Sequence, residues 1–348
     1  MATKRSPWQA LDKDTRWSLA SAWRSGFPPE AAALYGRWWQ LETWLRELIY
    51  VEQSALSGRA WIHSLPSSAA KRERSDAAQG YMATPDAQAR LAYLDVSPLF
   101  GLLTDDWDRY ADSLIDRPVW EGRVIELRKI RHRIGHCRRP HSDDLTRLEQ
   151  TLRDLDAGAF RAVSAYNRQQ VPSKTRTDPL DEAWSGGHPD ARRLLKHAES
   201  NYGVFFSLRY SKRPWAQDLP AAAAISGEAG YLWHARFIVT DGRPVDLRRL
   251  WSDDYLDPVR EQMVFLTIND PYGLEVSFAA IDDPSTTADA IGRLFDAVLT
   301  SPASSRVANQ AFTDRWARDH SDLDARVQVQ TAWSIVDDTT TPITMFGA

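Results

Sequence analysis

The amino-acid sequence predicts a multidomain fold, an all-α helical bundle followed by an α+β domain with a mostly antiparallel sheet. In the first 170 residues apolar side chains recur every three or four positions, which is the period of an amphipathic helix. Beyond residue 190, segments rich in β-branched and aromatic residues stand between helical ones. The 348 residues also exceed the roughly 250 to 300 at which single cores stop growing, so two domains are expected.

The N-terminal half is expected to begin with a long helix over 31–65. Its apolar stripe consists of Leu34, Trp38, Leu41, Leu45 and Leu48. The elements expected after it are a charged loop over 66–80 and helices over 84–93, over 97–115, after Pro118 and from Asp143. Ser142 is the expected N-cap of the last of these helices.

A polar stretch rich in Pro and Gly separates the two halves. It divides the chain into a helical domain over 1–168, a linker over 169–190 and an α+β domain over 191–348. In the second half, strands are expected over 202–210, 231–242, 263–270, 273–281 and 326–336, with a hairpin turn around Asn269 to Gly273. Helices are expected over 189–200, 244–263, 286–299 and 308–320.

Charge is distributed unevenly between the halves. Residues 1–177 carry 27 Lys or Arg against 22 Asp or Glu, whereas residues 178–348 carry 16 against 25. The basic half suits a polyanion, and the acidic half is a candidate sensor or regulator that restrains it. A single cysteine, the absence of a signal-peptide core and the absence of a long apolar run together predict a cytoplasmic protein that does not enter a membrane.

The stretch RKIRHRIGHCRRPHSDD, Arg128 to Asp144, carries the candidate chemistry. His132 and His136 are four positions apart and share a helix face, and Arg131 flanks them. Gly135 and Pro140 indicate an exposed helix end. Arg matches phosphate oxygens and His titrates near neutral pH, so the trio suits RNA phosphodiester cleavage without a metal or cofactor. The candidate residues for holding the RNA strand are Arg128, Lys129, Arg133, Arg138, Arg139 and His141.

Two other interpretations apply to this stretch. The charged residues are also typical of a solvated helix end. A metal site would draw on His132, His136, Cys137 and His141. On a helix, however, Cys137 would point about 100° away from His136. The surrounding arginines would also repel a dication, so no metal is expected.

The segment IRHRIGH resembles the signature of the HEPN superfamily, in which a polar residue follows an Arg and a His stands four to six positions after it. Arg131, His132 and His136 match this pattern position by position. The resemblance covers about residues 31–165 and implies a metal-independent endoribonuclease with a composite site in a homodimer of the helical domains. Glu42 and Arg46 of the first long helix are expected to form an ordinary helical ion pair. The resemblance also makes them candidate supporting residues, because a polar residue of that helix often faces the motif in this superfamily. Asn is commonest where this chain has His132, so the proton-transferring His is left open.

The expected function is therefore an endoribonuclease that leaves 2′,3′-cyclic phosphate ends and acts as a toxin or antiphage effector of the abortive-infection type. Its expected partners are RNA, such as tRNA or mRNA, a second copy of the chain, and an antitoxin or a phage-derived trigger. The alternatives are a non-catalytic HEPN-like module that binds RNA or a nucleotide, and an antitoxin-like interaction protein.

Overall fold

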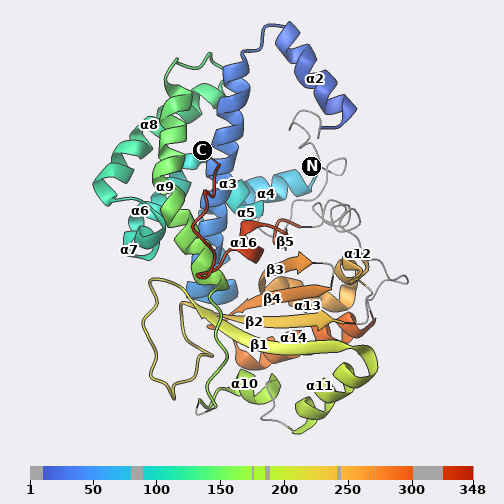
Figure 1. Cartoon of the computed structure of the whole chain (residues 1–348). Helices are drawn as coiled ribbons and strands as arrows, with labels where there is room; N and C mark the ends of the chain where they lie inside the picture. The colour runs from blue at the N-terminus through green and yellow to red at the C-terminus, as the bar shows by residue number, and fades with distance from the viewer. Residues whose placement is uncertain are drawn as a thin grey trace.

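The computed structural model describes residues 11–79, 89–174, 176–184, 189–240, 244–270, 272–300 and 324–347. A helical N-terminal region is followed by an α+β region with a five-stranded sheet, which confirms the predicted fold class (Figure 1). The helical region consists of α2 (Lys13–Arg24), α3 (Pro29–Ser57), η1 (Gly58–Ser64), α4 (Ser67–Ala77), α5 (Ala89–Ala92), α6 (Val96–Asp105), α7 (Trp107–Tyr110), η2 (Ala111–Ser113), α8 (Arg117–Gly135) and α9 (Asp144–Asn167).

The sheet has the strand order β1-β2-β4-β3-β5. Its strands are β1 (Val204–Lys212), β2 (Tyr231–Val239), β3 (Met263–Asp270), β4 (Gly273–Ala279) and β5 (Val327–Val329). All neighbouring pairs are antiparallel except β3 and β5, which are parallel, and β3 and β4 form the predicted hairpin. The helices of this region are α10 (Pro179–Trp184), α11 (Pro189–Tyr202), α12 (Leu247–Trp251), η3 (Asp254–Leu256), α13 (Asp257–Gln262), α14 (Pro284–Thr300) and α16 (Ala332–Ile335).

The sheet lies between two helical layers (Figure 1). Successive residues of a strand point to opposite faces. Accordingly, Leu232 and Ala279 join the core of the helical region, whereas Trp233 and Phe278 join a second core with α14. The N-terminal helices therefore share one hydrophobic core with a face of the sheet.

Several local predictions were wrong. The expected loop over 66–80 contains α4, because its Lys, Arg, Glu and Ala are good helix formers and Ala69 packs in the core. Helix α9 begins at Asp144 after Asp143, so Ser142 is not its N-cap. The strand expected over 326–336 ends at Val329, and α16 follows it. Helix α2 was not anticipated from the sequence.

The segment expected to be a linker is packed against the sheet. Gln170 pairs with Tyr210 of β1, and the buried Asp178 accepts the N–H groups of Leu180 and Ile225 at 2.9 and 2.7 Å. The helix expected over 308–320 and the start of that over 84–93 lie outside the described residues. Among the described helices, none has the length and apolar character needed to cross a membrane.

Candidate functional site

The C-terminal end of α8 presents the candidate residues to solvent. Cys137 has a φ of 52°, and its N–H donates to the Ile134 carbonyl at 3.1 Å while that of Arg138 donates to the Arg133 carbonyl at 2.9 Å. These two bonds define a Schellman turn, which normally carries glycine at the left-handed position. The turn ends the helix before Pro140 and leaves His132 and His136 exposed, as the sequence predicted.

The two histidines are in contact. Their ring centroids are 4.4 Å apart with an interplanar angle of 64°. Partial desolvation, followed by the charges of His136 and Arg138, lowers the pKa of His132 below its ordinary value. His132 is therefore neutral at pH 7 and able to accept a proton. Arg128 lies one turn before it on the same ridge of the helix.

Arg131 points away from this ridge and toward α3. Its Nε lies 4.0 Å from Oε2 of Glu42. A Cβ at Gly135 would lie 2.0 Å from Arg131 Nη1, so the absence of a side chain at Gly135 is what allows the guanidinium to lie along the helix. Within the described residues, no hydrogen bond joins Arg131 to either histidine. The motif is thus divided into a histidine pair and a neighbouring Arg–Glu pair.

Glu42 and Arg46 form the expected i,i+4 ion pair, and Glu42 also lies beside Arg131 of the motif. Glu42 accepts hydrogen bonds from the Arg46 guanidinium and from Trp38 Nε1, and Arg46 Nε also donates to the Leu91 carbonyl at 3.2 Å. These groups line a pocket of about 390 Å³ between α3 and α8. Its full lining is Tyr35, Trp38, Trp39, Glu42, Arg46, Arg131, Ile134 and Gly135.

Two of these lining residues, Tyr35 and Trp39, were missed in the sequence. Both are more than half exposed, at 59% and 61%. The available signal was their spacing, because the two aromatic residues are four positions apart and lie outside the leucine stripe of the helix.

The cations proposed to hold a strand fall into two groups. Arg128, Lys129, Arg138 and Arg139 are exposed and form no ion pair within the described residues, and His141 is exposed beside them. Arg133, in contrast, forms a bidentate pair with Asp144, with Nε 2.7 Å from Oδ2. Its charge is therefore already compensated within the fold.

Asp144 is the anchor of the turn between α8 and α9. It is 1% exposed and also accepts the His141 N–H at 2.9 Å. Burial alone would raise the pKa of Asp144, but the Arg133 guanidinium and the His141 N–H outweigh it, and the pKa is lowered. The carboxylate is therefore ionised at neutral pH and holds the turn that carries the exposed cations.

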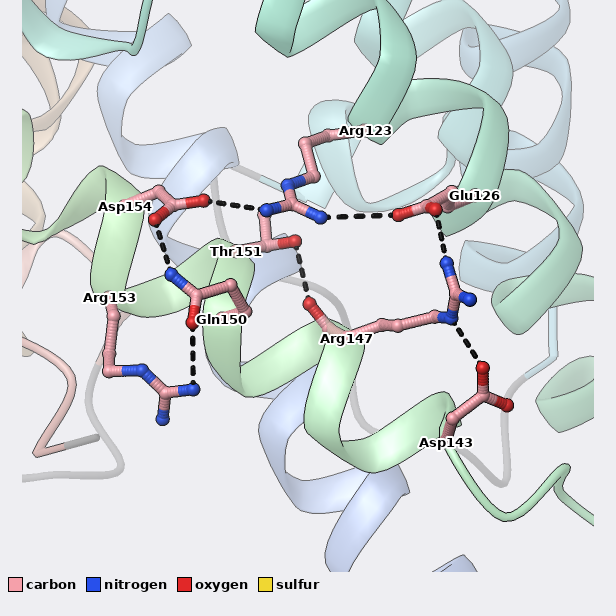
Figure 2. A network of polar contacts seen from close by, with 8 residues as sticks. All are labelled: Arg123, Glu126, Asp143, Arg147, Gln150, Thr151, Arg153 and Asp154. Carbon is pink, nitrogen blue, oxygen red and sulfur yellow. Dashed lines mark hydrogen bonds and ion pairs between the residues drawn. The ribbon is translucent and has the colours of Figure 1, made fainter.

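Further polar contacts join α8 and α9 along their length (Figure 2). Arg123 of α8 contacts Glu126 at 3.3 Å and reaches Asp154 of α9 at 2.9 Å. Arg147 of α9 pairs with Glu126 and with Asp143. These cations and carboxylates compensate one another, so among the described residues the cations of α8 that lack an ion pair are Arg128 and Lys129 in its C-terminal half.

Within the described residues, one group of three potential metal ligands has its atoms within 4.8 Å of one another, and it consists of His141, Asp143 and Asp144. Both aspartates already pair with arginines, Asp144 with Arg133 and Asp143 with Arg147. A dication would have to displace these guanidinium groups, so the donor set does not favour one.

No family model, no curated protein and no solved structure matches the chain.

Proposed function

We propose that the protein is a metal-independent endoribonuclease. In the proposed reaction the ribose 2′-OH attacks the adjacent phosphorus and the bond to the 5′-oxygen breaks, leaving a 2′,3′-cyclic phosphate and a 5′-OH. The observation that carries the proposal is the contacting pair of His132 and His136 at an exposed helix end surrounded by uncompensated cations.

The residues suit complementary roles. His132 accepts the proton of the 2′-OH as general base, and His136 donates a proton to the leaving 5′-oxygen as general acid, so each exchanges one proton per cleavage. The lowered pKa of His132 supports its assignment as the base. Arg131 stabilises the additional negative charge on the phosphate oxygens, and Glu42 positions its guanidinium.

The biological setting follows from the resemblance to HEPN ribonucleases of the toxin and abortive-infection branch. The proposal therefore includes action on cytoplasmic RNA such as tRNA or mRNA, a homodimer formed through the helical region, and control by an antitoxin or a phage-derived trigger. The exposed Arg128 and Lys129 of α8 and Arg138 and Arg139 in the turn after it support RNA as the substrate, because such cations bind the phosphates of a nucleic-acid backbone whatever its sequence.

The first prediction concerns cleavage in the presence of EDTA. The purified protein is expected to cut RNA in excess EDTA and to leave 2′,3′-cyclic phosphate ends, as identified by end-group analysis. His136→Ala and Arg131→Ala should each lower the rate at least about 100-fold, since acid–base and charge-stabilising groups contribute on this scale. His63→Ala removes an exposed histidine of η1 and should leave cleavage unchanged. Loss of activity with EDTA, or fully active His136→Ala protein, would contradict the proposal.

A second candidate function is RNA binding without cleavage. It is favoured by one observation, the separation of Arg131 from the histidine pair by its contact with Glu42. This alternative requires salt-sensitive RNA binding by the wild type. It also requires that no cyclic phosphate product form over a wide range of pH.

A further inference from the structure

We propose that the pocket between α3 and α8 binds an unpaired base of single-stranded RNA, stacked on Tyr35 and Trp39, while Arg131 contacts the adjoining phosphate. That the bound strand is a substrate rests on the proposed ribonuclease function. The inference adds a binding subsite on α3 that holds one unpaired base beside Arg131.

The first argument is the exposure of the two aromatic side chains. Tyr35 and Trp39 lie one turn apart on α3 and keep 59% and 61% of their surface in solvent, whereas Trp38 between them is 3% exposed. Base stacking uses the face of an aromatic ring and tolerates any sequence, because each base has a π-face. Two accessible rings at this spacing provide such a surface.

The second argument is the position of the charge. Arg131 lines the same pocket and is 37% exposed, so its guanidinium remains accessible despite the Glu42 contact. A base on Tyr35 or Trp39 therefore lies beside a phosphate-binding group. The neighbouring residue on α8, His132, then borders the backbone of the same nucleotide.

The third argument is size and strand state. The pocket measures about 390 Å³, which is within the range of about 300–1,000 Å³ found for small-molecule sites. A paired base is stacked within its helix and cannot enter, whereas a base in a loop or a single strand can turn outward. The geometry thus favours unpaired RNA.

The experiment measures binding separately from cleavage. The probe is a short fluorescent single-stranded RNA with 2′-O-methyl riboses, which cannot be cut by 2′-OH attack, compared with the same strand in a duplex. By fluorescence anisotropy, the wild type should bind the single strand more tightly. Tyr35→Ala and Trp39→Ala should each weaken that binding about tenfold, the scale of losing one base-stacking contact. Trp39→Phe should retain most of the affinity, because a ring remains.

Trp17→Ala is the matched control, since Trp17 of α2 is similarly exposed, at 66%, and does not line the pocket. Equal binding of single strand and duplex, or alanine variants that bind like the wild type, would overturn the inference. The inference would also be overturned if the alanine variants changed only the self-association of the protein, measured by sedimentation equilibrium. That result would assign this face to a second copy of the chain. If the binding pattern holds but natural RNA is never cut, the pocket stands and the nuclease proposal fails. If RNA is cut and the aromatic variants cut single strands as fast as the wild type does, the nuclease proposal stands and the base-binding pocket is refuted.

Discussion

Two consecutive residues of α8 serve different contacts. Arg131 reaches across to Glu42 of α3, while His132 stays on the solvent ridge beside His136. The helical step of about 100° between neighbours explains this division. A strand that spans both positions would meet the guanidinium on one side and the two imidazoles on the other. The separation seen in the described residues is therefore compatible with one substrate that bridges them.

A prediction at this scale concerns the pKa of His132. Desolvation, His136 and Arg138 lower it, so removing the Arg138 charge should raise it toward its ordinary value of about 6.5. We expect Arg138→Gln to give a higher His132 pKa in an NMR titration of the imidazole signals. Because the base must be neutral, the acid limb of the cleavage profile, normalised to its maximum, should move to higher pH as well.

Lys129→Gln provides the control for this measurement. Lys129 is also an exposed cation of α8, three positions before His132, but it is not among the groups that lower the His132 pKa. If both variants shift the titration equally, a general loss of positive charge is responsible. The specific contribution of Arg138 would then be refuted.

At the scale of elements, the turn between α8 and α9 depends on Arg133 and Asp144. We predict that Asp144→Asn lowers the free energy of unfolding by about 2 to 3 kcal/mol. This is less than the roughly 3 to 5 kcal/mol for breaking a fully buried pair, because the Arg133 side chain remains 19% exposed. Urea denaturation measures the change, provided that the slope m is the same for both proteins.

The same pair should give the stability a defined pH dependence. The folded-state pKa of Asp144 lies below the unfolded value of about 3.9, so its contribution is present above that value and is lost as the pH falls through the lowered pKa. The difference between wild type and Asp144→Asn should therefore shrink in acid. Asp143→Asn is the matched control, because solvent screens the exposed Asp143–Arg147 pair and its loss should cost much less stability than the loss of the buried Asp144 carboxylate. Equal losses for the two variants would contradict the prediction.

The elements also show what the sequence could predict. The apolar stripe that begins at Leu34 predicted α3, because apolar residues that recur every three or four positions can be recognised in a short stretch of sequence. Helix α4 lacks such a face and is held partly by side chains distant in sequence, such as Arg90 on Glu73, so its polar composition suggested a loop. The Arg133–Asp144 pair likewise depends on the geometry of a turn. Composition placed Arg133 with the free cations, and only the fold separates it from them.

At the scale of the whole molecule, the C-terminal region is joined to the helical one by specific contacts. Tyr50 of α3 donates to the Met263 carbonyl at 3.1 Å, and Trp333 of α16 donates to Glu47 at 2.9 Å. The chain then returns across α3, where the ring of Phe346 meets that of Trp44 edge to face at 5.4 Å. Deleting residues 178–348 would remove apolar side chains that pack in the core of the helical region and would destabilise that region. A change in activity after this deletion would therefore not show that the acidic half is a regulator. Substitutions at the contacts between the two regions are the better approach.

The buried pair of Glu52 and Arg213 is one such contact. Arg213 is fully buried, and its Nε lies 3.1 and 3.0 Å from the two carboxylate oxygens of Glu52 on α3. Trp215 also donates to Glu52, at 2.7 Å, and Arg213 Nη2 donates to the Ala162 carbonyl of α9 at 3.1 Å. The pair thus connects α3, α9 and the segment after β1.

We predict that Glu52→Leu lowers the free energy of unfolding by about 3 to 5 kcal/mol, because it leaves the Arg213 charge buried without a partner. Adding Arg213→Met should recover much of the loss, since an apolar pair removes that charge. The shared core requires that both regions unfold together, so hydrogen exchange should show amides of α9 and of β2 losing protection by the same free energy. Asp95→Asn, which breaks the exposed and solvent-screened pair with Arg72, should cost much less stability than Glu52→Leu. Loss of protection confined to one region would show instead that the two halves fold independently across this contact.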